Sequence, residues 1–150
     1  MADERTEMIM LAWVRLIRAH DRVVANVEAA VKAKGLPPID WYDVLLELSR
    51  EGGRRLRPVE LEKELLVAQY NLSRLLDRMV EAGLVQREPC DGDGRGQMVS
   101  LTPKGKAMQK EMWPHIREVV MNEMTVLKDA DVEKLSKLLT PLANWFPTKK

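Results

Sequence analysis

A single β-hairpin signal in an otherwise helical chain is the feature that most limits the fold. Residues 84–88 and 97–101 have the composition of two strands, and residues 89–96 between them are rich in Gly and Asp. A lone two-stranded hairpin is marginally stable in water, so it must pack against neighbouring helices. Aromatic residues make up only 5% of the chain, which also favours helices over a β-sandwich. The sequence therefore predicts a mainly α fold that carries one hairpin.

Helical periodicity covers most of the remaining chain. Apolar residues recur every three or four positions in residues 7–34, 41–50, 58–65, 69–82, 103–127 and 131–145. Asp40 is expected to cap the second of these helices, Pro58 to open the third and Thr102 to cap the fifth. Pro114 is expected to bend or break the fifth helix. Because only a few residues join the third and fourth helices, these two are predicted to form a helix-turn-helix.

The outward face of the predicted helix 69–82 carries side chains that can read DNA. In a helix-turn-helix the second helix lies in the major groove, where Gln and Asn can pair with adenine and Arg with guanine. Ser and Tyr can hold phosphates. The candidate DNA-binding residues on this helix are Gln69, Tyr70, Asn71, Ser73, Arg74 and Arg78. The same pattern is typical of a solvated helix surface, and the hairpin that follows immediately favours DNA contact.

Two arginines of the hairpin are further candidates for DNA contact. The net charge of the chain is +1, so attraction to DNA must come from a local patch. Arg95 stands at the end of a glycine-rich tip, and Arg87 lies on the first strand. An arginine on such a hairpin can enter a narrow minor groove, where the potential is most negative. The alternative is a plain surface hairpin with a spare arginine.

Residues 56–105 resemble the winged helix of the MarR family of transcription regulators. The matching features are the leucine-rich helix, its Arg-Met-Val-Glu-Ala-Gly-Leu-Val exit, the Asp93-x-Arg95 wing and the Leu101-Thr-Pro-Lys-Gly105 restart. The flanking helices also match the family plan. The resemblance implies a homodimer with intertwined terminal helices on a roughly palindromic operator, with Asp93 and Arg95 as the wing pair. The family's second wing arginine is replaced here by Gly96, so a weaker wing contact is expected.

The apolar stripes of the terminal helices also predict a dimer, because one winged helix cannot cover them and large exposed apolar patches mark interaction sites. The expected interface residues are Ile9, Val132, Leu135, Leu138, Leu139 and Leu142. Packing of the terminal helices on each other within one subunit is the alternative. The chain is thus expected to be one domain of 150 residues, in which residues 7–34 and 103–146 form dimerisation helices and residues 40–102 form the DNA-binding part.

A pocket between the dimer helices and the winged helix is a candidate effector site, because the resemblance implies a response to small aromatic acids or oxidants. Trp and Arg can hold a planar anion by stacking and charge pairing. The candidate ligand-binding residues are Trp13, Arg15, His20 and Trp41. The alternative is that the two tryptophans and His20 belong to the core. Acidic residues around Cys90 argue against that thiol as a redox sensor.

Other classes of function lack a sequence signal. We find no phosphate loop, nucleophile elbow, metal motif or cofactor motif, so neither an enzyme nor a metal sensor is expected. One cysteine, no signal peptide and no membrane segment predict a cytoplasmic protein. The function expected is that of a bacterial-type, sequence-specific DNA-binding regulator, with repression and release by a small aromatic or anionic ligand as hypotheses. The alternative is a helical module that binds other proteins through its winged helix.

Overall fold

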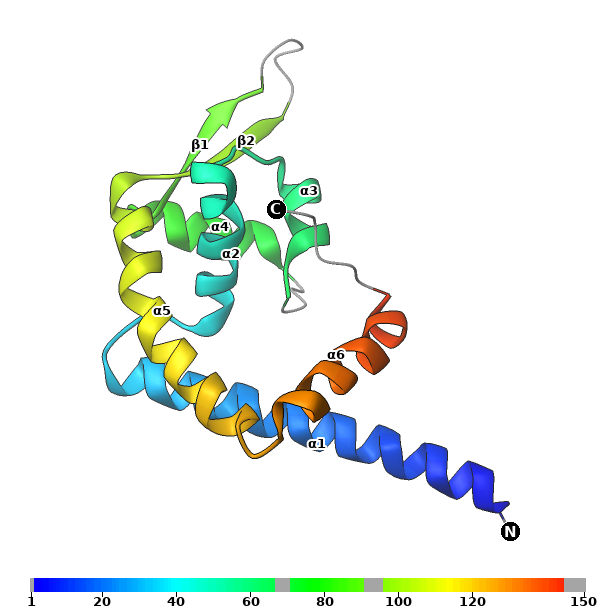
Figure 1. Cartoon of the computed structure of the whole chain (residues 1–150). Helices are drawn as coiled ribbons and strands as arrows, with labels where there is room; N and C mark the ends of the chain where they lie inside the picture. The colour runs from blue at the N-terminus through cyan, green and yellow to red at the C-terminus, as the bar shows by residue number, and fades with distance from the viewer. Residues whose placement is uncertain (1, 67–70, 91–95, 145–150) are drawn as a thin grey trace.

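The computed structural model describes residues 2–66, 71–90 and 96–144, and it has the predicted mainly α fold with one hairpin (Figure 1). β1 and β2 are antiparallel, with Val85 opposite Leu101 and Pro89 opposite Gln97. The elements in chain order are α1 (Glu4–Ala33), α2 (Ile39–Ser49), the 3₁₀ turn η1 (Arg50–Gly52), α3 (Pro58–Glu64), α4 (Leu72–Glu81), β1 (Val85–Pro89), β2 (Gln97–Leu101), α5 (Pro103–Met124) and α6 (Asp129–Ala143).

Of the three predicted start signals, Pro58 and Thr102 are confirmed and Asp40 is not, and the helix predicted over residues 69–82 spans Leu72–Glu81. Pro58 is at the first position of α3, and the Thr102 hydroxyl accepts a hydrogen bond from the Gly105 N–H at 3.0 Å at the start of α5. The prediction that Asp40 caps α2 is wrong, because α2 begins at Ile39. The Ile39 N–H instead donates to the Glu28 carboxylate of α1 at 3.0 Å. A tertiary contact between two helices therefore satisfies the backbone group that a local cap would satisfy.

Pro114 does not break α5, which is continuous from Pro103 to Met124. A proline inside a helix removes one hydrogen-bond donor and leaves the carbonyl four residues earlier without its partner. Here that residue, Lys110, is exposed, as is Pro114 itself. Water can therefore solvate the unpaired carbonyl, which lowers the cost of the proline in this position.

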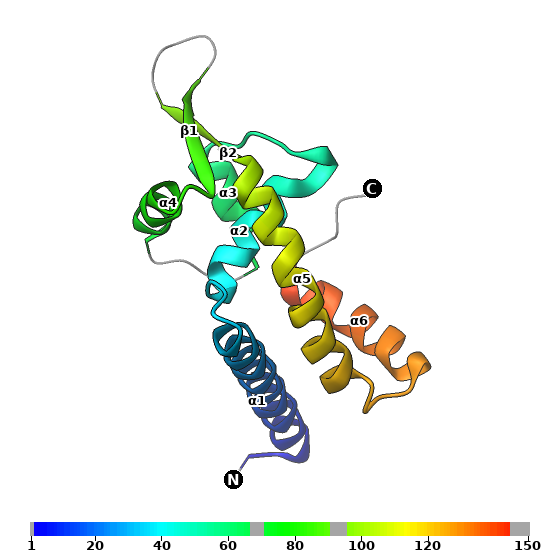
Figure 2. The ribbon, with the colours of Figure 1, turned by 90° about the vertical axis from the view of Figure 1, so that its left-hand side faces the viewer.

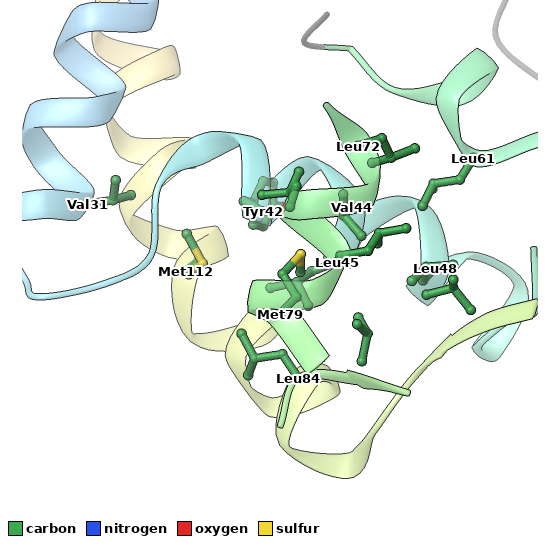
Figure 3. Close-up of a cluster of buried hydrophobic side chains, with 14 of the residues drawn as sticks. Val31, Tyr42, Val44, Leu45, Leu48, Leu61, Leu72, Met79, Leu84 and Met112 are labelled. Atoms are coloured by element: carbon green, nitrogen blue, oxygen red, sulfur yellow. The ribbon is translucent and has the colours of Figure 1, made fainter. Parts of the chain in front are cut away.

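The hydrophobic core lies where α2, α3, α4, the hairpin and α5 meet (Figure 3). Of α1, only Val27 and Val31 are buried in it. Burial of one such side chain contributes about 1.5–3 kcal/mol relative to an exposed one. The fully buried side chains include Leu45, Leu48, Leu61, Leu76, Met79, Leu84, Val99 and Met112.

Backbone contacts attach the hairpin to the link before α3 and to α5, as its marginal stability requires. The Leu56 N–H donates to the Val99 carbonyl at 3.1 Å, and the Val99 N–H donates to the Leu56 carbonyl at 2.8 Å. The link before α3 therefore pairs with β2 as a short third strand. On the other side, the first turn of α5 packs so closely on Leu84 that a Cβ on Gly105 would lie 1.9 Å from the Leu84 carbonyl oxygen.

The terminal helices extend away from this core (Figures 1 and 2). The first two-thirds of α1 has no buried residue, and neither has any part of α6. Leu138 is 63% exposed and Leu142 68% exposed, while Ile9 on α1 is 48% exposed. Val132, Leu135 and Leu139 are half-buried. Among the described residues, no helix combines the length and the hydropathy that a membrane crossing requires.

Candidate nucleic-acid interface

The helix α4 presents one apolar and one polar face, as its periodicity predicts. Its apolar face packs into the core through Leu72, Leu75, Leu76 and Met79. The side chains on its opposite face are exposed, and they are Ser73, Arg74, Asp77 and Arg78. Two guanidinium groups and a hydroxyl therefore face solvent along one side of the second helix of the helix-turn-helix. This combination can donate hydrogen bonds to base edges and to phosphates.

Asn71 has a structural role that the sequence analysis missed. Its side-chain oxygen accepts a hydrogen bond from the Arg74 N–H at 3.1 Å, which makes Asn71 the N-cap of α4. Asn is among the best N-cap residues, and loss of such a cap costs typically about 1 kcal/mol. The signal was present in the sequence, since an Asn directly before an amphipathic run is a helix start signal. A substitution of Asn71 therefore changes the helix as well as any contact with a base.

Arg87 joins the hairpin to α4. Its guanidinium donates to the Asp77 carboxylate at 2.7 Å and to the Ser73 carbonyl at 3.4 Å. The sequence analysis treated Arg87 only as a DNA contact and did not foresee this ion pair across two elements. The pair sets the position of β1 relative to α4, so that the hairpin and the polar face of α4 form one surface.

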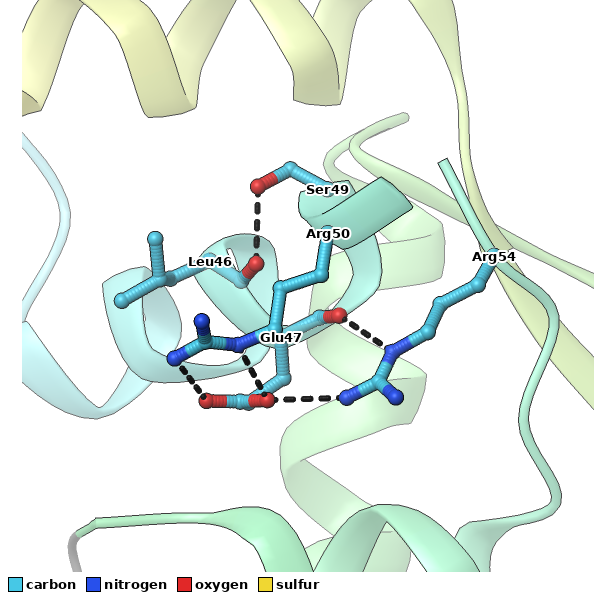
Figure 4. A network of polar contacts seen from close by, with 5 residues as sticks. All are labelled: Leu46, Glu47, Ser49, Arg50 and Arg54. Atoms are coloured by element: carbon cyan, nitrogen blue, oxygen red, sulfur yellow. Dashed lines mark hydrogen bonds and ion pairs between the residues drawn. The ribbon is translucent and has the colours of Figure 1, made fainter. Parts of the chain in front are cut away.

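A buried carboxylate organises the turn that follows α2 (Figure 4). Glu47, whose side chain is 7% exposed, accepts hydrogen bonds from Arg50 at 2.9 and 3.1 Å and from Arg54 at 2.9 Å. The Glu47 backbone carbonyl also accepts from Arg54 Nε at 2.8 Å. The hydrogen bonds with Glu47 raise the pKa of Arg50 above its ordinary value. This network anchors the link between α2 and α3. No motif in the sequence predicted it.

Four of the predicted DNA-binding residues, Gln69, Tyr70, Asp93 and Arg95, lie outside the described residues. Cys90 directly follows β1 and is buried. Reactive thiols are partly exposed, so its burial agrees with the argument against a redox role. Within residues 2–66, 71–90 and 96–144, no three His, Cys, Asp or Glu side chains gather as a metal site would require.

The four candidate ligand-binding residues are spread over the surface of α1 and the start of α2. The alternative that they belong to the core is wrong for Trp13, which is 56% exposed, and for His20, whose side chain is 67% exposed and contacts Asp21 at 3.1 Å. It holds for Trp41, which is half-buried and packs against the core. Arg15 is exposed. A hollow at the base of the hairpin and another on α5 are lined by other residues.

Comparison with known proteins shows that the chain is similar to members of the MarR family. Residues 34–96 match the family model described as MarR family. The chain is 36% identical over 90 residues to the multiple antibiotic resistance protein MarR of Salmonella typhimurium, a match that covers 57% of this chain and only 62% of that protein's length. It is 28% identical over 135 residues to the HTH-type transcriptional repressor IacR of Pseudomonas putida, covering 90% of this chain and 78% of IacR.

A solved structure extends the likeness to nearly the whole chain. A mutant MarR from E. coli, complexed with operator DNA, superposes with a TM-score of 0.77 at 27% identity. The superposition covers 94% of this chain and 99% of that one. The likeness therefore includes the terminal helices as well as the helix-turn-helix and the hairpin.

Proposed function

Because the chain belongs to the MarR family of winged helix transcription regulators, we propose that it is a sequence-specific DNA-binding regulator that acts as a homodimer on a pseudo-palindromic operator. The family consists of DNA-binding transcription factors without enzymatic activity, and the chain is accordingly not an enzyme. The observation that carries the proposal is the outward face of α4, with Ser73, Arg74 and Arg78 exposed. The Arg87–Asp77 ion pair holds the hairpin, hereafter the wing, beside that face.

A two-fold dimer suits this surface. Dimeric helix-turn-helix proteins place their two recognition helices about 34–36 Å apart, so that they enter successive major grooves on one face of the DNA. The uncovered apolar side chains of α1 and α6 supply the surface for such a dimer. The operator-bound E. coli MarR is a precedent for binding to a defined site.

Repression and release by a ligand are the finer parts of the proposal. The name of IacR as a repressor supports repression. For release, we keep the four residues of the sequence prediction as the proposed contacts for a small aromatic or anionic ligand: Trp13, Arg15, His20 and Trp41. In a dimer, the partner subunit would cover part of the exposed surface of α1, and a pocket could form there. The ligand must bind one conformation of the dimer better than another to release DNA.

The decisive experiment is the selection of bound duplexes from a random DNA pool at two salt concentrations. Enrichment of a palindrome with half-sites about one helical turn apart is the expected result. Binding through phosphates weakens steeply as salt rises. Failure to enrich any sequence, together with salt-insensitive retention of other proteins, would favour the alternative of a protein-binding winged helix.

Replacement of Arg74 by Ala is expected to weaken binding by roughly 1–3 kcal/mol at particular base pairs. Arg74 is exposed in the first turn of α4, and a guanidinium can form a bidentate pair with guanine. The measurement is the affinity for the selected duplex and for a set of single base-pair variants of it. Lys110→Ala, which removes one exposed cation from α5, is the control. An equal loss on every duplex would show that Arg74 contacts phosphate only.

Replacement of Arg95 by Ala is expected to reduce affinity for all duplexes rather than to change sequence preference. An arginine that enters a narrow minor groove reads the shape and potential of the groove more than the identity of a base. The comparison of the selected duplex with a random duplex in one titration series measures this. A loss confined to one base pair would contradict the role proposed for the wing.

A further inference from the structure

We propose that Glu88 is a positioning residue for DNA binding, which fastens β1 of the wing to the link between α2 and α3. The inference rests on the proposed function, because the wing matters only if the protein binds DNA. Glu88 is the fourth residue of β1 and lies opposite Met98 of β2. In the sequence, Glu88 stands out only as one of the acidic residues near Cys90. The structure surrounds its carboxylate with partners from three segments.

Each oxygen of the Glu88 carboxylate has a partner. Oε2 pairs with Nε of Arg55, in the link before α3, at 2.7 Å. Oε1 accepts hydrogen bonds from the Ser100 hydroxyl of β2 at 3.1 Å and from the Gln86 amide of β1 at 3.0 Å. One side chain thus joins both strands of the wing to the link. Hydrogen bonds to a charged group are roughly twice as strong as neutral ones.

The wing is consequently held on both of its faces. Neighbouring side chains of a strand point to opposite faces, so Arg87 and Glu88 leave β1 in opposite directions. Arg87 pairs with Asp77 of α4, and Glu88 pairs with Arg55 of the link. The residue before Arg55 is Arg54, which is itself tied to Glu47 of α2. The link is therefore anchored to α2 at one residue and to the wing at the next.

This anchoring bears on DNA binding because the direction of β1 and β2 relative to α4 sets how the wing and the polar face of α4 can meet one DNA duplex. The existing backbone support of β2, through Leu56 and Val99, lies nearer the middle of the strand. Glu88 acts at a second place, one residue before the last paired position of β1, Pro89, so it adds a restraint on the wing that the pairing of Leu56 with Val99 does not supply.

The charge of Glu88 separates a positioning role from the alternative that its carboxylate has no role in DNA binding. A carboxylate beside a DNA-binding surface repels phosphates, so removal of an idle carboxylate should raise the affinity for every duplex. Removal of a positioning carboxylate should lower the affinity. The two interpretations of Glu88, whose side chain is 32% exposed, thus predict changes of opposite sign.

The test compares wild type, Glu88→Gln, Arg55→Glu and the charge-swapped pair Arg55→Glu with Glu88→Arg. We expect Glu88→Gln to bind the selected duplex roughly fivefold more weakly, with faster amide hydrogen exchange in residues 85–89 and 97–101. The swapped pair, whose net charge equals that of wild type, should recover most of the affinity and protection. Glu81→Gln removes an exposed carboxylate at the end of α4 and should not weaken binding. Melting temperatures of all variants verify that the fold is retained.

Unchanged or increased affinity of Glu88→Gln would overturn the inference, and so would a swapped pair that binds no better than Arg55→Glu alone. If wild type enriches no duplex at all, the proposed function fails instead. Hydrogen exchange then still tests whether Glu88 attaches the wing to the link, because this measurement needs no DNA. Equal exchange in wild type and Glu88→Gln would show that Glu88 does not hold the wing.

Discussion

Gly105→Ala is expected to destabilise the protein by roughly 3 kcal/mol and to lower its melting temperature by about 10 °C. A new Cβ at Gly105 would lie 1.9 Å from the carbonyl oxygen of Leu84, 2.9 Å from its carbonyl carbon and 3.2 Å from the Leu101 side chain. The nearest obstacle is backbone, which cannot turn away as a flexible side chain would. The helix must therefore move off the start of β1 or the strand must shift.

Helix propensity alone predicts that Gly105→Ala stabilises the protein, whereas the close contact with Leu84 predicts that it destabilises the protein. The measured change in stability therefore separates the two effects. Alanine in the interior of an exposed helix is favoured over glycine by about 1 kcal/mol. Movement of α5 would also strain two hydrogen bonds at its start, from the Thr102 N–H to Leu84 and from the Thr102 hydroxyl to Gly83. Thermal unfolding followed by circular dichroism measures the change. Lys106→Ala, at the next and exposed position, is the matched control and should leave the melting temperature nearly unchanged. A Gly105→Ala protein as stable as wild type would show that α5 does not approach Leu84 this closely.

The double variant Leu138→Glu with Leu142→Glu is expected to weaken dimerisation by about a thousandfold or more. Both leucines lie on the stripe of α6 and are more than half exposed in the single chain. In a dimer that covers this stripe, each glutamate would be buried without a partner, which costs several kcal/mol, and each factor of ten in affinity corresponds to about 1.4 kcal/mol. Sedimentation at micromolar concentration should show monomers where wild type is dimeric.

Loss of the dimer should also remove most of the affinity for the selected duplex. Two linked recognition helices bind about 10²- to 10⁴-fold more tightly than one. Lys137→Glu is the charge-matched control, since it changes the net charge by the same two units on the outward face of α6, where Lys137 pairs with Glu133 at 2.9 Å. That control should stay dimeric. A folded dimer of the double variant would place the interface elsewhere and leave α6 out of it.

The local signals of the sequence predicted most of the fold. Glycine, proline and cap positions located the helices, and alternation located the hairpin, because these are properties of short segments. Two errors arose from surroundings that lie outside the helix concerned. Glu28 of α1 satisfies the start of α2 and made a cap at Asp40 unnecessary, and solvent around Pro114 allowed α5 to continue. Neither effect is encoded within one helix.

In the candidate interface too, properties of one segment could be predicted from the sequence, and contacts between distant segments could not. The exposure of Ser73, Arg74 and Arg78 follows from the period of α4, so the sequence was sufficient to predict it. The pairing of Arg87 with Asp77 and of Arg55 with Glu88 joins residues that are 10 and 33 positions apart. Many Arg and acidic residues could have formed such pairs. Only the packing of the hairpin against α4 and against the link selects these two.

Under the proposed function, the N-cap at Asn71 constrains how operator preference can diverge among descendants of this protein. Only a few residue types, chiefly Asn, Asp, Ser, Thr and Gly, start a helix well. A mutation at position 71 that would suit a new base must also preserve the start of α4. In the part of the chain that the structure describes, the side chains of Ser73, Arg74 and Arg78 cap no helix, so evolution can vary them more freely. A designer who grafts the specificity of one relative onto another should keep a capping residue at position 71 and exchange the turns that follow it.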